Sequence, residues 1–180
     1  GVGKTTTSVT LGSALAREGK NVLLLDLDPH ACATLHARIF PEEVTASLHD
    51  IFLSEEEAWP SLWSRVIHTG ALQGMDIAPG HIRLSELEVD FRERRAKGAV
   101  LTRSLMALKD RYDFIILDCP PHAGILLVNA LVAADLLIIP IQTDFFALHG
   151  LKLLFDTLHI LNKVLPVPIR YRAVPTMYDR

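Results

Sequence analysis

The sequence begins with the motif Gly1-Val2-Gly3-Lys4-Thr5-Thr6, which constrains the fold and the chemistry more than any other stretch. Glycines allow a backbone to wrap closely around a polyphosphate, with its N–H groups pointing inward. In the matching half of a P-loop, the lysine charge lies on the β- and γ-phosphates and the next hydroxyl binds Mg²⁺. We therefore expect Gly1, Val2, Gly3, Lys4, Thr5 and Thr6 to bind a nucleotide. Lys4 would be the catalytic charge and Thr5 a magnesium ligand.

A P-loop joins a strand to a helix. The helix is expected over Thr5–Glu18, where its N-terminal partial positive charge would add to the phosphate site. The chain begins inside the motif, so we expect a fragment that lacks the first strand. The abrupt stop at Arg180 predicts that the C-terminal part is also absent.

Continuous apolar runs alternate with helical patterns along the chain. Runs of this kind are typical of strands buried on both faces of a parallel sheet. The expected strands are Val22–Leu25, Met75–Ala78, Phe114–Leu117, Leu136–Ile139 (ended by Pro140), and a strand starting over Ile169–Val174. The further expected helices are Ala46–Phe52, Glu55–Val66, Leu84–Phe91, Ala99–Leu108, Ala123–Ala133 and Phe145–Leu161. This alternation predicts an α/β fold, a doubly wound and mostly parallel sheet flanked by helices, in one P-loop domain over residues 1–180.

Two aspartates follow buried strands. Asp118 ends the run Phe114–Leu117, and Asp28 lies in Asp26-Leu27-Asp28-Pro29 after the run Val22–Leu25. Open α/β sheets bind ligands at the carboxyl ends of their strands. Asp118 is expected to hold Mg²⁺ through its water shell. Asp28 could orient or deprotonate an attacking water, or could cap a helix that starts at Pro29, and spacing alone leaves both open.

Composition and charge argue against a nucleic-acid-binding protein held by its overall charge, and against a membrane-spanning protein. A formal net charge of −3 over 180 residues gives no global electrostatic case for nucleic acid. The basic stretch 92–97 is more simply an exposed helix end than a phosphate-contacting patch. No apolar run reaches the length of a membrane span, so the cytoplasm is the expected compartment. Cys32 and Cys119 are expected to be free thiols.

The tryptophans and histidines are expected to have structural rather than catalytic roles. Trp59 and Trp63, at helical spacing, are expected to pack in the core. The eight histidines show no metal-binding spacing and are expected at the surface or at helix ends. His122, close to Asp118, is the one histidine for which a catalytic role is also considered.

The ordered motifs resemble those of one family. Gly1 to Thr7 resembles the end of the deviant Walker A motif of the ParA/MinD ATPases, and Asp26-Leu27-Asp28-Pro29 resembles their Asp-x-Asp-Pro segment. Asp118-Cys119-Pro120-Pro121 resembles the Walker B region, and Thr176-Met177-Tyr178-Asp179 is more similar to ParA/Soj than to MinD. The chain departs from the family at His30-Ala31-Cys32, where Gln-Gly-Asn is more usual. The family's signature lysine would precede Gly1.

The resemblance implies an ATP-dependent dimer switch that requires Mg²⁺. In such proteins ATP lies between two subunits, the dimer binds DNA without sequence preference, and a ParB-like partner or cargo adaptor stimulates hydrolysis. The resemblance assigns Asp28 to water activation, Asp118 to the Walker B role, and Lys4 and Thr5 to phosphate and Mg²⁺. It implies that the intact protein positions plasmids, chromosomes or other cargo, and is nucleoid-associated when ATP-bound. The alternatives are a MinD-like membrane-positioning ATPase, a P-loop phosphotransferase and an inactive nucleotide-binding scaffold.

Overall fold

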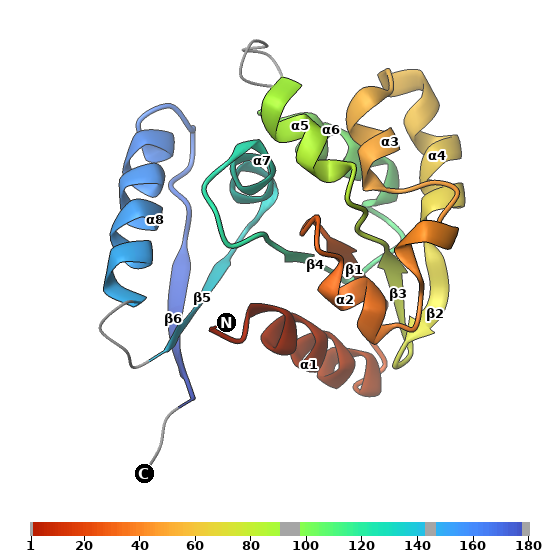
Figure 1. Ribbon diagram of the computed structural model, residues 1–180, viewed down its shortest axis with the longest axis horizontal. Helices are drawn as coiled ribbons and strands as arrows, with labels where there is room; N and C mark the ends of the chain where they lie inside the picture. The colour runs from red at the N-terminus through yellow and green to blue at the C-terminus, as the bar shows by residue number, and fades with distance from the viewer. Residues whose placement is uncertain (1, 91–97, 143–146, 178–180) are drawn as a thin grey trace.

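The computed structural model describes residues 2–90, 98–142 and 147–177 (Figure 1). Its main sheet has four strands in the order β2-β3-β1-β4, and a second sheet pairs β5 with β6. The strands are β1 (Val22–Asp26), β2 (His68–Leu72), β3 (Met75–Ala78), β4 (Phe114–Asp118), β5 (Leu137–Gln142) and β6 (Tyr171–Thr176). All strand pairs are parallel except β2 with β3. The predicted α/β class with a mostly parallel sheet is confirmed.

Strand β1 forms the centre of the core, and all five of its residues are buried. Leu23 and Leu25 pack into one apolar cluster with residues of the helices above the sheet. Leu24, the residue between them, packs into a second cluster with Val9 and Ala33 on the opposite face. Because successive strand residues point to opposite faces, an unbroken apolar run is what a strand covered on both faces requires.

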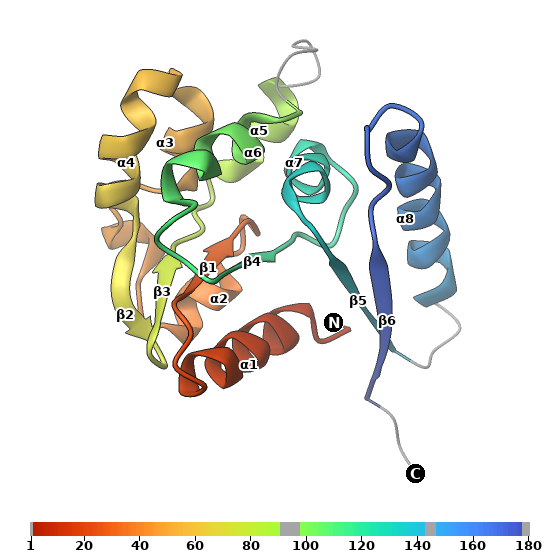
Figure 2. The same cartoon turned by 180° about the vertical axis from the view of Figure 1, so that it is seen from behind.

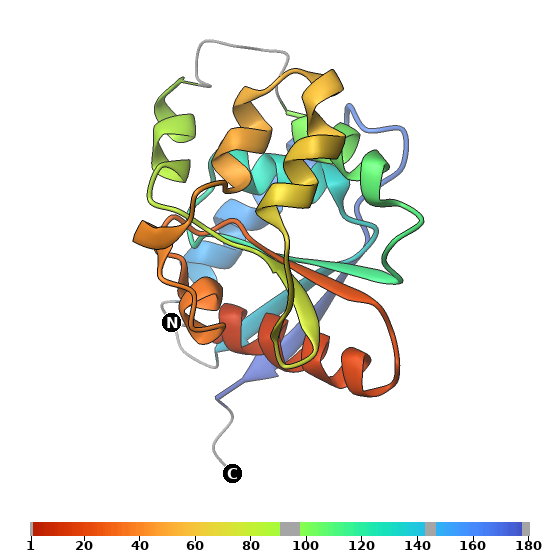
Figure 3. The same cartoon turned by 90° about the vertical axis from the view of Figure 1, so that its right-hand side faces the viewer.

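The helices form layers on both sides of the sheet (Figures 1 and 2). They are α1 (Lys4–Arg17), α2 (Cys32–His36), α3 (Leu48–Leu53), α4 (Trp59–Val66), α5 (Leu84–Asp90), α6 (Val100–Leu105), α7 (Ile125–Ala133) and α8 (Ala147–Asn162). Short 3₁₀ turns cover Pro41–Glu43, Glu56–Ala58 and Met106–Leu108. Figure 3 shows α1 crossing beneath the strands, while α3 to α7 lie above them. Leu131 of α7, Leu158 of α8 and Ile169 form a third, smaller cluster beside β5 and β6.

The predicted helices are present with small shifts of their ends, except that the predicted ends at Phe91 and Phe145 lie outside the described residues. Helix α2 was not predicted. Trp59 and Trp63 are buried, and their indole N–H groups donate to the carbonyl oxygens of Ile51 (3.1 Å) and Ser104 (2.9 Å). The interpretation of these tryptophans as core residues is confirmed.

Two strand predictions were wrong in detail. Strand β5 continues through Pro140 to Gln142, with Pro140 opposite Val174 of β6. Proline is tolerated in a strand whose N–H side is not needed for a ladder, and in the described residues β5 pairs only with β6. Burial on both faces holds for β1 but not for β4, which is half-buried and whose Phe114 side chain is exposed. Strand β4 pairs with β1 on one side only among the described strands, which leaves its other side less covered.

Strand β2 was missed because its sequence has no apolar run. It is joined to β3 by the two-residue turn Gln73-Gly74, in which both residues have positive φ (49° and 87°). Such turns match the twist of an antiparallel hairpin. No helix in the described part of the chain is both long and apolar enough to span a membrane.

Candidate functional site

The loop before α1 has the backbone of an anion-binding site. Gly3 is the N-cap of α1 and has a φ of +84°, a conformation that L side chains rarely adopt. Its carbonyl oxygen accepts hydrogen bonds from the backbone N–H (2.9 Å) and the hydroxyl (2.8 Å) of Thr7. No described side chain caps α1, and its first turn carries no acidic residue. The first N–H groups and the positive end of the helix are therefore available to phosphates.

The loop is tied to the opposite end of the chain. Thr176, the last residue of β6, donates its hydroxyl to the carbonyl oxygen of Val2 at 2.9 Å. This bond could not be predicted from spacing, because 174 residues separate the two partners. Gly1 lies outside the described residues, so its predicted contact with phosphate stays a prediction.

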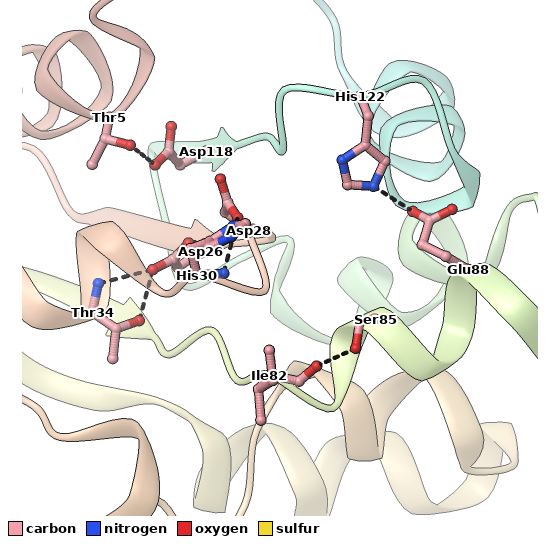
Figure 4. A network of polar contacts seen from close by, with 10 residues as sticks. All are labelled: Thr5, Asp26, Asp28, His30, Thr34, Ile82, Ser85, Glu88, Asp118 and His122. Carbon is pink, nitrogen blue, oxygen red and sulfur yellow. Dashed lines mark hydrogen bonds and ion pairs between the residues drawn. The ribbon is translucent and has the colours of Figure 1, made fainter. Parts of the chain in front are cut away.

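Thr5 and Asp118 are brought together at the edge of the sheet. The Thr5 hydroxyl donates to Oδ2 of Asp118 at 2.7 Å (Figure 4). Ser8, one turn further along α1, donates to Oδ1 at 3.1 Å. Asp118 is 1% exposed, and this burial raises the pKa of its carboxyl, while the two hydroxyls and the nearby Lys4 charge act in the opposite direction. The sequence analysis missed Ser8, although its i,i+3 spacing from Thr5 places both on one helix face.

Asp26 organises the neighbouring strand end. It lies opposite Asp118 in the parallel register and is fully buried. Its Oδ2 accepts hydrogen bonds from the backbone N–H and the hydroxyl of Thr34, both at 2.8 Å, and its Oδ1 accepts the Asp28 N–H at 3.2 Å. Burial raises the pKa of Asp26 to about 6, despite these hydrogen bonds. Asp26 thereby joins β1 to α2 and orients the backbone that carries Asp28.

Asp28 lies in a turn and does not cap a helix. Its backbone oxygen accepts the Ala31 N–H at 2.9 Å, with Pro29 at the second position of the turn, where proline is favoured. Helix α2 begins at Cys32 and its N-cap is Ala31, so the alternative in which Asp28 caps a helix from Pro29 is wrong. The Asp28 carboxylate is mostly buried, and its Oδ1 accepts the N–H of His30 at 2.9 Å.

Gly80 packs directly against this turn. A Cβ at position 80 would lie 2.9 Å from the carbonyl oxygens of both Asp26 and Asp28. The Gly80 N–H also donates to the Thr34 hydroxyl at 2.8 Å. The dipeptide Pro79-Gly80 was interpreted only as the end of a strand, so the sequence analysis missed this role.

The other predicted candidates lie away from the phosphate loop. His122 lies 3.8 Å from Glu88 of α5, whose carboxylate accepts the first N–H groups of α7 from Ile125 and Leu126 (Figure 4). The acidic partner of His122 is thus Glu88, which caps α7, and not Asp118. His49 lies in the first turn of α3, a helix end as expected, but it is buried, with its Nε2 3.3 Å from Glu86.

Both cysteines are free, as expected. Burial raises the pKa of the Cys119 thiol to about 12, which disfavours its thiolate form beside Asp118.

The residues present fit a magnesium ion held together with a nucleotide. Among the described residues, no cluster of three or more His, Cys, Asp or Glu side chains could hold a metal alone. The site offers instead the Thr5 hydroxyl and the Asp118 carboxylate. Mg²⁺ prefers oxygen ligands and is commonly bound by one or two protein groups, with phosphates and water completing the octahedron. The geometry is therefore that of a P-loop nucleotide-binding protein.

Comparison with known proteins agrees with this class. A protein-family model described as an AAA domain matches residues 1–169. The chain is 38% identical over 180 residues to the sporulation initiation inhibitor protein Soj of Bacillus subtilis, covering 99% of this chain and 69% of Soj. It is 34% identical over 183 residues to the chromosome partitioning protein ParA of Caulobacter vibrioides, covering 100% of this chain and 67% of that protein.

A solved structure also matches closely. It is the structure of cobyrinic acid a,c-diamide synthase from Mycobacterium smegmatis with bound ATP analog and magnesium. The match has a TM-score of 0.89 at 33% sequence identity, and covers 99% of this chain and 71% of that one. Taken together with the sequence relatives, these matches show that the chain belongs to the ParA/MinD-type P-loop ATPases.

Proposed function

We propose that this chain is the ATP-binding and ATP-hydrolysing part of a ParA-type dimer switch, acting as one domain over residues 1–180. The observation that carries the proposal is the Thr5–Asp118 hydrogen bond of 2.7 Å, which joins the start of α1 to the end of β4. When Mg·ATP binds, the two oxygens of this pair would face the metal and its water shell. Lys4 and the uncapped N-terminus of α1 would neutralise phosphate charge.

Asp28 is the residue that we assign to water activation. Hydrolysis requires a water to lose a proton as its oxygen bonds to the terminal phosphorus and the bond to ADP breaks. In the described residues, both hydrogen bonds to the Asp28 carboxylate reach Oδ1, so Oδ2 is left to accept that proton. A carboxylate at the strand end next to Asp118 is suitably placed to orient the water.

The dimer switch rests on the relatives. The proteins named Soj and ParA match nearly the whole of this chain at 34–38% identity. By this similarity we assign to the intact protein an ATP-dependent homodimer, sequence-independent DNA binding, a ParB-like or cargo-adaptor partner that stimulates hydrolysis, and a cytoplasmic, nucleoid-associated location. The chain spans 69% of Soj and 67% of ParA, so these properties concern the intact protein.

The test is a comparison of wild type with Asp28→Ala in the intact protein. Asp28→Ala should keep Mg·ATP binding and ATP-dependent dimerisation, measured by light scattering in ADP and in Mg·ATP, but should lose about 100-fold or more in turnover. Unchanged turnover in this variant would exclude Asp28 from water activation. A species that remains monomeric in Mg·ATP would exclude the dimer switch.

A second candidate function comes from the structural match. The Mycobacterium smegmatis protein is named as a diamide synthase, and it is as similar in sequence to this chain as the partition proteins are. An ATP-dependent synthase or phosphotransferase would release ADP only when an acceptor is supplied. Steady turnover without an acceptor, stimulated by DNA and a partner protein, would favour the switch.

A further inference from the structure

His30 makes a contact with Asp28 that neither the P-loop nor the magnesium site requires. Its ring Nδ1 lies 2.9 Å from Oδ1 of Asp28, and its backbone N–H donates to the same oxygen, also at 2.9 Å. Figure 4 shows Asp28 with His30 beside it and Asp118 at the end of the neighbouring strand. The His30 side chain is 76% exposed, whereas that of Asp28 is 12% exposed. An exposed ring thus contacts a carboxylate that is almost enclosed by the protein.

The chemistry of the pair fixes which nitrogen carries the proton. An ionised carboxylate can only accept hydrogen bonds, so the ring nitrogen that faces Asp28 must be the donor. Two donors on Oδ1 restrict the rotation of the carboxylate, and they leave Oδ2 without a partner among the described residues. The oxygen that remains is the one left to accept a hydrogen bond from a substrate water.

The backbone of the turn fixes where the His30 side chain begins. Pro29 fixes its own φ, and the Ala31 N–H closes the turn onto the Asp28 carbonyl oxygen. Ala31 has a φ of +52°, a left-handed conformation that costs about 1–2 kcal/mol for an L-residue other than glycine or asparagine. Ala31 is also buried, so the surrounding structure enforces this conformation. Strained residues of this kind concentrate at functional sites.

We propose that His30 is a positioning residue for ATP hydrolysis, and that its Nδ1–H group holds Oδ1 of Asp28 so that Oδ2 is aimed at the attacking water. This inference rests on the proposed role of Asp28. In this role His30 acts on Asp28 and not on the phosphates or the metal. Its loss should therefore lower the rate of the chemical step and leave nucleotide binding unchanged.

The experiment measures kcat, KM and Mg·ATP affinity for His30→Ala, His30→Asn and a control, His36→Ala, in the intact protein. His36 is the matched control because its ring, too, has a polar contact at 2.9 Å, but with the Cys32 carbonyl oxygen of its own helix and not with Asp28. His30→Ala should lower kcat about tenfold, a size expected for a modest misplacement of the base. KM and affinity should stay within about twofold of wild type.

The asparagine variant separates positioning from simple loss of bulk. Its amide N–H group stands near the position of the ring Nδ1 and can donate to Asp28, so His30→Asn should recover most of the lost kcat. His36→Ala should behave as wild type. Wild-type kcat in His30→Ala, or equal losses in the alanine and asparagine variants, would overturn the inference.

The outcomes also separate this inference from the function on which it rests. If Asp28→Ala abolishes turnover and His30→Ala does not change it, Asp28 keeps its role and only the assignment of His30 fails. If Asp28→Ala retains wild-type turnover, the assignment of the base fails, and that of His30 fails with it.

Discussion

Replacing Gly80 with alanine should damage both stability and hydrolysis, because the added methyl group has no room. Its Cβ would lie 2.9 Å from the carbonyl oxygens of Asp26 and Asp28, and 3.0 Å from Cγ of Asp26. A relaxed carbon–oxygen contact is about 3.3 Å or more, so the turn must move away by roughly 0.4 Å. Neither oxygen belongs to a flexible side chain, so the backbone itself must move.

The expected cost of this overpacking is about 1–3 kcal/mol of unfolding free energy. For a chain of 180 residues, that corresponds to a decrease in melting temperature of about 2–4 °C per kcal/mol. Because the displaced carbonyl belongs to Asp28, kcat should also fall about tenfold, while Mg·ATP affinity is kept by the P-loop.

The assays are urea unfolding and steady-state ATP turnover, with Gly150→Ala as the control. Gly150 lies within α8, and a Cβ there would meet nothing within 4 Å. That substitution should therefore stabilise the chain by about 0.5–1 kcal/mol. Wild-type stability and turnover in Gly80→Ala would refute the close approach of Gly80 to the Asp28 turn.

Further substitutions test three other places in the structure. Glu88→Ala should cost about 1 kcal/mol of unfolding free energy, because α7 loses the acceptor at its N-terminus. Gly124→Ala should cost a similar amount, since a Cβ at Gly124 would occupy the place of the Glu88 carboxylate. The double variant should cost little more than either single variant, because both remove the same contact. Burial lowers the pKa of His49 from 6.5, so the folded state binds fewer protons than the unfolded state. The unfolding free energy of the wild type should therefore decrease as the pH drops below 6.5. Urea unfolding across the acid range should show a smaller decrease in His49→Leu. Ala31→Val should cost more than about 1 kcal/mol in urea unfolding, because a β-branched residue is disfavoured at positive φ, and Ala31→Gly is the tolerated comparison.

The parts of the fold that the sequence predicted are those with strong local patterns. Strands β1 and β4 follow from apolar runs ended by Asp26 and Asp118, and α1 follows from the glycine-rich motif before it. Strand β2 was missed because His68–Leu72 is short and largely polar. Its strand character comes from pairing with β3 through a tight turn, which is a tertiary effect.

The residues of the candidate site also divide into those that a local motif predicted and those that it did not. Lys4, Thr5 and Asp118 were predicted from motif chemistry, and the Thr5–Asp118 contact agrees with the prediction. The role of Asp28 was assigned only through the family resemblance. Contacts between distant segments that carry no nucleotide-binding motif were not predicted. Thr34 and Gly80 are 46 residues apart, and only the folded chain brings them together beneath the Asp28 turn.

The central claim, that the N-terminal loop binds Mg·ATP, is tested most directly by isothermal titration calorimetry with Mg²⁺ and a slowly hydrolysed ATP analogue. The intact protein should bind one nucleotide per chain. Lys4→Ala should weaken that binding about tenfold or more, a loss of at least about 1.4 kcal/mol, and Asp28→Ala should leave it unchanged. Equal affinity in wild type and Lys4→Ala, or the absence of binding by wild type, would contradict the account.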